Sequence, residues 1–106
     1  MYDTYVFVLE AWYAYANHPN VKYIYFDYHD KFTIGIVQLH TPVNTDEARV
    51  ELGLYRAADY IDKLWFIPVV DGKLLEPMPH KLKVPKYCLH PPATRFGTFS
   101  KQELHL

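Results

Sequence analysis

Apolar and polar residues alternate most clearly between residues 21 and 40, on both sides of the polar turn His29-Asp30-Lys31. The flanking runs are rich in β-branched and aromatic residues, which favour strands. A two-residue turn at Asp30 and Lys31 pairs them as a β-hairpin. Side chains of a strand alternate between its two faces. One face then carries Ile24, Phe26, Tyr28, Thr33, Val37 and Leu39, and the other carries Tyr23, Tyr25, Asp27, Phe32, Ile34, Ile36 and Gln38. Neither face is polar, so both need a cover.

The first apolar run, residues 5–9, fits two secondary structures. Asp3 or Thr4 can cap a helix that continues to Ala16, and the polar stretch 17–20 would end it. The same residues suit a buried strand by residue type, and periodicity does not separate the two for so apolar a run. Both interpretations stay open, and in either case the run belongs to the core.

A second helix is predicted after a linker at residues 41–43. Asn44 and Glu47 have the spacing of a capping box, the reciprocal side-chain and backbone pairing at a helix start. Apolar residues then follow with helical period. This stripe consists of Val50, Leu54, Ala57, Ala58, Ile61, Leu64 and Trp65.

A short second hairpin is predicted near residues 66–75, with strands 65–70 and 73–75 on either side of Asp71-Gly72, a dipeptide that suits a type I′ turn. Pro68 lacks a backbone N–H and places the first of these strands at an edge or at its own start. From residue 77 onward, repeated prolines forbid long regular elements and favour an extended path.

These patterns predict one small α+β domain over residues 1–106. Its antiparallel sheet, hairpin 21–40 plus the short hairpin near 66–75, packs with one or two helices, and residues 77–106 form an extended Pro-rich basic tail on the body. The composition, 50% apolar and 17% aromatic, supplies enough burial to exclude intrinsic disorder. No apolar segment reaches the ~20 residues of a membrane span. A single cysteine, Cys88, and the lack of a secretory signal favour an intracellular, cytoplasmic setting.

Charge is distributed unevenly, although the net charge is only −1. Between residues 77 and 102 the chain carries five basic side chains and no acid. These possible contacts to an anionic partner are Lys81, Lys83, Lys86, Arg95 and Lys101. The tail either packs on its own acidic body or reaches for phosphate or an acidic partner.

Candidate chemistry is weak. Six histidines suggest a metal, but His29 and His40 lie at opposite ends of the hairpin, and His18 with His40 gives only two ligands of a zinc set. Cys88 with His90 matches no catalytic motif. The acidic pairs Asp27 with Asp30 at a turn and Glu47 with Glu51 at a helix start need no catalytic role. No phosphate loop, GxSxG, HExxH or CxxC motif is present, so we predict no catalytic residue, no metal site and no cofactor.

The ten tyrosines favour binding over catalysis, because tyrosine joins a large apolar ring to a polar tip. We therefore predict a non-enzymatic module of adaptor or inhibitor type that binds a protein partner through an aromatic sheet face and can form a homodimer. The predicted surface is Tyr23, Tyr25, Phe32, Ile34 and Ile36. By size alone, accessory proteins of viruses and mobile elements are analogous.

Two alternatives remain open. A nucleic-acid-binding protein would use the hairpin aromatics and the basic tail, although the pI of 6.6 is low for that role. A small enzyme or metal-binding protein would use the histidines.

Overall fold

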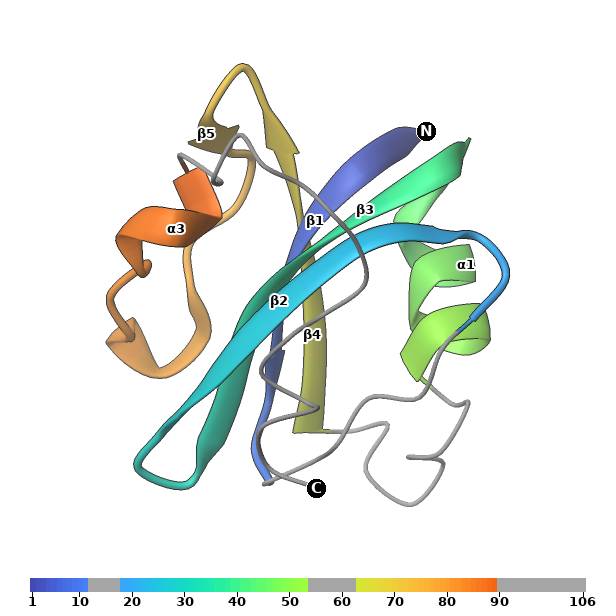
Figure 1. Cartoon of the computed structure of the whole chain (residues 1–106). Helices are drawn as coiled ribbons and strands as arrows, with labels where there is room; N and C mark the ends of the chain where they lie inside the picture. Colours follow the sequence, from blue (N-terminus) through green and yellow to red (C-terminus); the bar gives the residue numbers. More distant parts are fainter. Residues whose placement is uncertain (12–17, 54–62, 90–106) are drawn as a thin grey trace.

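The computed structural model describes residues 1–11, 18–53 and 63–89, and it is dominated by one antiparallel sheet (Figure 1). The strand order is β2-β3-β1-β4-β5. The strands are β1 (Tyr2–Leu9), β2 (Val21–His29), β3 (Phe32–Val43), β4 (Leu64–Val70) and β5 (Lys73–Leu74). The described helical segments are short: α1 (Thr45–Glu47), the π-helix η1 (Ala48–Gly53), the 3-10 turn η3 (Pro79–Lys81) and α3 (Lys86–Leu89). The protein is thus a small sheet-dominated domain, and its described residues contain less helix than the sequence predicted for them.

Of the two alternatives for the N-terminal run, the strand is correct and the helix is wrong over the described residues, because residues 2–9 form β1. This strand lies in the middle of the sheet, antiparallel to β3 on one side and to β4 on the other. All five residues from Tyr5 to Leu9 are buried. A central strand buries both of its faces, which explains why its sequence shows no alternation of polar and apolar residues. Residues 12–16 of the predicted helix lie outside the described residues.

The main hairpin is confirmed. His29 pairs with Phe32, which leaves Asp30 and Lys31 as the two-residue turn, and Asp30 has a positive φ of 57°. The two sheet faces receive the side chains that the alternation predicted. The prediction of a linker at residues 41–43 is wrong, because β3 continues to Val43, which pairs with Tyr2 in β1.

The short hairpin is confirmed as well. Asp71 and Gly72 both have positive φ values, 54° and 75°, as a type I′ turn requires. Pro68 lies where the pairing of β4 passes from β1 to β5, since Tyr5 pairs with Pro68 and Val69 pairs with Leu74.

The second helix is confirmed at its start and corrected beyond it. The Asn44 side chain accepts a hydrogen bond from the Glu47 backbone N–H at 2.8 Å and donates one to the Glu47 carboxylate at 3.1 Å. The next six residues form a π-helix, whose i→i+5 hydrogen bonds do not keep the period that the apolar stripe assumed.

Two ends of the apolar stripe are therefore misplaced. Val50 is 58% exposed, whereas Ala48 is fully buried. Leu64 belongs to β4 rather than to a helix, and Trp65 lies in β4 as the prediction of the second hairpin had it. The remaining members of the stripe, residues 54–61, lie outside the described residues.

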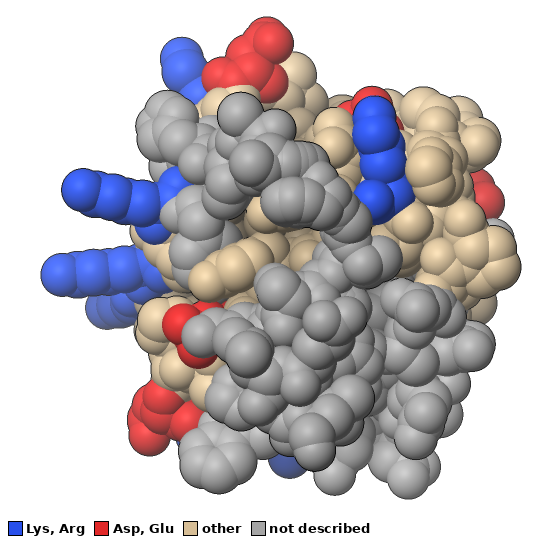
Figure 2. Space-filling model, viewed as in Figure 1, with Lys and Arg blue, Asp and Glu red and all other residues tan. Residues whose placement is uncertain are grey.

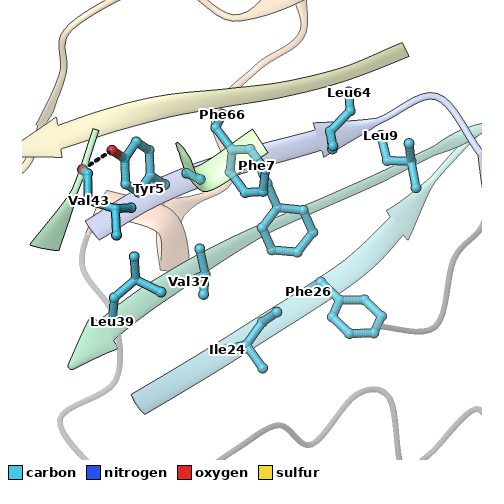
Figure 3. Packing of buried hydrophobic residues seen from close by; sticks show 11 residues of the cluster. Tyr5, Phe7, Leu9, Ile24, Phe26, Val37, Leu39, Val43, Leu64 and Phe66 are labelled. Atoms are coloured by element: carbon cyan, nitrogen blue, oxygen red, sulfur yellow. Dashed lines mark hydrogen bonds between the residues drawn. The ribbon is translucent and has the colours of Figure 1, made fainter. Parts of the chain in front are cut away.

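The first face of the sheet carries an aromatic and aliphatic cluster (Figure 3). The buried Tyr5 hydroxyl donates a 2.7 Å hydrogen bond to the Val43 carbonyl, which joins β1 to the end of β3. Phe7 packs edge-on against Phe26, with ring centroids 6.3 Å apart. Ala48 from the helical segment is part of this cluster, so that segment covers the first face.

The second face is covered by residues 74–89, which we call the covering segment. Buried residues of β1, β3 and β4 form this face together with Cys88 of α3. Side chains of the covering segment that pack on them are Leu74, Met78, Leu82 and Val84.

Candidate functional site

The covering segment presents a row of exposed lysines, Lys81, Lys83 and Lys86, which we call the lysine row. Leu82 and Val84 alternate with them and pack on the second face of the sheet. Leu82 and Val84 are half-buried, whereas Lys81 and Lys83 are exposed. In Figure 2, basic side chains project from the side of the molecule where Figure 1 draws the covering segment and α3.

These three lysines are not neutralised within the described part of the chain. The ion pairs recorded there join Glu10 to Lys31 and to His80, and none includes a member of the lysine row. Arg95 and Lys101, the other predicted contacts to an anionic partner, lie outside the described residues.

An open groove of about 590 Å³ adjoins the lysine row. Its described lining is mainly apolar: Leu74, Leu75, Pro77, Met78, Leu82 and Val84, with Lys81 and Glu76 as its charged members. Leu75 remains 48% exposed. The groove therefore places exposed apolar surface next to fixed positive charge.

A polar and aromatic cluster fastens the covering segment to the sheet. The carboxylate of Glu10, just after β1, forms an ion pair with Nζ of Lys31 in the hairpin turn at 3.0 Å. It also lies 3.6 Å from Nε2 of His80. The His80 ring also contacts Phe32 and Trp65, with centroid separations of 5.4 and 5.3 Å. Residues from four separate segments thus meet at one point.

The backbone at this contact is strained. His80 and Lys81 both have left-handed φ values, 55° and 56°, which cost non-glycine residues roughly 1–2 kcal/mol each. Such strain persists where surrounding contacts determine the conformation, and it gathers at functional segments. The contacts of His80 therefore also fix the backbone conformation of the adjacent Lys81 and the direction of its side chain.

Lys31 also changes the acidity of Glu10. Its hydrogen bond to the carboxylate, ahead of the opposing effect of desolvation, holds the pKa of Glu10 below its usual value. Glu10 is therefore anionic at neutral pH, with Nε2 of His80 3.6 Å from its carboxylate.

The predicted aromatic surface is divided by the structure. Phe32, Ile34 and Ile36 are only 5%, 2% and 1% exposed. Tyr23 and Tyr25 are half-buried beside them. In this conformation only the two tyrosines of the predicted set have surface that a partner can touch.

The remaining candidates show structural roles. Nδ1 of His18 accepts the Asn20 backbone N–H at 3.1 Å, and Asp27 accepts that of Tyr28 at 2.8 Å. Burial raises the pKa of the Cys88 thiol to about 12, which opposes thiolate formation. Among the described residues, no group of three potential ligands is arranged to hold a metal ion.

Sequence reasoning found the basic residues but missed the cluster around His80. Nothing near Glu10, Lys31 or His80 in the sequence marks them as neighbours, because the strand register and the return of the covering segment bring them together. Two prolines before His80 indicate an irregular loop but not its contacts.

Comparison with known proteins adds no family. No family model, no curated protein and no solved structure matches this chain. Within the described residues, none of the helices combines the length and the apolar character needed to cross a membrane.

Proposed function

We propose that this protein is a non-enzymatic interaction module that binds an acidic segment of a protein partner along the lysine row and the adjoining groove. The observation that carries the proposal is the alternation of residues 81–84, in which the half-buried Leu82 and Val84 pack on the sheet and the exposed Lys81 and Lys83 alternate with them. A segment already ordered before binding loses less entropy on association. Acidic residues of the partner would pair with the lysines.

The groove supplies the apolar part of the interface. Leu75 and its neighbours can receive large apolar side chains from the same partner segment, and central apolar contacts usually dominate binding energy. The lysines then contribute mainly register, association rate and selectivity. A purely electrostatic role would not need this exposed apolar lining.

The proposed function is still that of a protein-binding module, but the binding surface is the lysine row and the groove instead of the aromatic sheet face. Binding through Ile34 and Ile36 would require displacement of the covering segment, which packs on their face of the sheet. The lysine row is accessible without any such change.

The test is a binding titration with a fluorescent peptide of alternating glutamate and leucine. We expect Lys81→Glu, Lys83→Glu and Lys86→Glu together to weaken binding by at least about tenfold. Lys22→Glu, an exposed lysine on β2, is the matched control and should leave the affinity unchanged. Equal binding by the triple variant and the native protein would refute the proposal.

Two further measurements separate the alternatives. A single-stranded oligonucleotide that binds more tightly than the peptide, with a steep dependence on salt, would favour the nucleic-acid function instead. Light scattering over a concentration series tests the predicted homodimer, and loss of a dimer in the triple variant would place the lysine row at a self-interface.

A further inference from the structure

A second, more enclosed cavity of about 200 Å³ lies on the second face of the sheet, separate from the lysine row. Four strands or their turns contribute to it, and α3 closes it with Cys88. Its described lining residues are Thr4, Tyr23, Ile36, Gln38, Val69, Asp71, Gly72 and Cys88.

The strand pairing explains the position of this cavity. Tyr23, Gln38 and Thr4 form one cross-strand row, because Gln38 pairs with both of the others. Val69 would continue the row, but β4 ends its pairing with β1 at Pro68 and pairs with β5 instead. Figure 1 shows β1 and β4 diverging toward this end of the sheet. The cavity lies beside the point of divergence.

The lining combines an apolar interior with one charge. Ile36 and Cys88 are almost fully buried, and Val69 packs beside them. Gln38 offers an amide group, and the Thr4 hydroxyl donates a 2.9 Å hydrogen bond to the Asp3 carboxylate. Asp71, on the exposed turn, is the one charged residue among the described lining residues.

This arrangement suits a small amphiphilic cation. A 150 Å³ apolar cavity is known to hold benzene, so about 200 Å³ accommodates a ligand of comparable or slightly larger size. An apolar stem would lie against Ile36 and Val69. A cationic head would reach the Asp71 carboxylate, and charge-assisted hydrogen bonds of that kind are the stronger ones.

We propose that this cavity binds a primary ammonium carried on a short apolar stem. Cys88 acts as an apolar wall and not as a nucleophile. The site is independent of the lysine row, so the two proposals can fail separately.

Three probes of nearly equal shape test the charge requirement: n-pentylammonium, 1-pentanol and pentanoate. Each is titrated into the isotopically labelled full chain while the Gly72 amide and the Gln38 side-chain amide are followed by NMR. We expect pentylammonium to bind about tenfold more tightly than pentanol, with pentanoate the weakest. Equal affinity for the three probes, or shifts confined to other residues, would overturn the proposal.

Asp71→Asn is the decisive variant, because asparagine also tolerates the left-handed conformation of this turn. It should weaken pentylammonium binding about tenfold and leave pentanol binding unchanged. Lys73→Gln, in the same hairpin but absent from the described lining, is the matched control and should change neither affinity. An unchanged affinity of Asp71→Asn for pentylammonium would remove Asp71 from the site and the proposal with it.

Discussion

Gly35 lies in the centre of the sheet, where a side chain would collide with its neighbours on both sides. Gly35 pairs with Phe7 of β1 and with Phe26 of β2. A Cβ atom there would lie 2.5 Å from both Phe26 Cβ and the Tyr25 carbonyl oxygen, and 2.7 Å from Phe7 Cζ. Ordinary contacts to a Cβ are 3.4–4 Å long. Gly35→Ala therefore requires shifts of about 1 Å.

Two of the three colliding atoms belong to, or are fixed by, the backbone of β2, so they cannot move by a simple side-chain rotation. Overpacking of a core typically costs about 1–3 kcal/mol. Replacing glycine with alanine also restricts the unfolded chain, which returns about 0.4–1 kcal/mol. Because the approaches of 2.5 Å to β2 place this site at the upper end of the overpacking range, we expect a net loss of about 2 kcal/mol in the free energy of unfolding.

A urea melt followed by circular dichroism measures this loss. For a domain of this size, with an m-value of about 1–2 kcal/mol/M, the midpoint should fall by about 1–2 M. Phe7→Leu supplies the control, since removing the ring tip relieves one of the three collisions. The double variant should be less destabilised than the sum of the two single variants. Neutral substitutions change the free energy of unfolding by less than about 0.5 kcal/mol. A change of that size or smaller in Gly35→Ala would refute the close packing of β2 and Phe7 around Gly35.

Two further predictions concern polar contacts. Tyr5→Phe leaves the buried Val43 carbonyl without its 2.7 Å hydrogen bond and should cost about 1–3 kcal/mol in a urea melt, whereas no measurable change would contradict the burial of this pair. For Glu10, the depressed pKa means that its contribution to stability is present above the unfolded pKa and is lost as the pH falls through the folded value. An NMR titration of the carboxylate should therefore show a higher pKa in Lys31→Gln, and an unchanged pKa would rule out Lys31 as the main cause.

Elements held by local chemistry were predictable from sequence. The turns at 30–31 and 71–72, the assignment of the hairpin side chains to two faces, and the cap at Asn44 each depend on residues close together in the chain. Side-chain alternation and turn conformation follow from backbone geometry that those few residues control. For this reason the structure confirms the predicted turns, the two faces of the hairpin and the cap.

Elements decided by distant partners were not predictable in the same way. Tyr5 to Leu9 became a strand because β3 and β4 supply hydrogen-bonding partners on both sides, which no local pattern reveals. Leu64 and Trp65 fitted the helical period yet joined β4 by pairing with β1.

The same distinction between local and distant contacts applies to the candidate sites. The sequence by itself determined that positive charge gathers between residues 77 and 102, and that Tyr23 and Ile36 share a face. Only the tertiary structure decided that Leu82 and Val84 turn inward and leave the lysines outside, that His80 meets Glu10, and that β4 leaves β1 beside a cavity. Charge and alternation are properties of neighbouring residues, whereas burial and enclosure depend on which distant segments pack together.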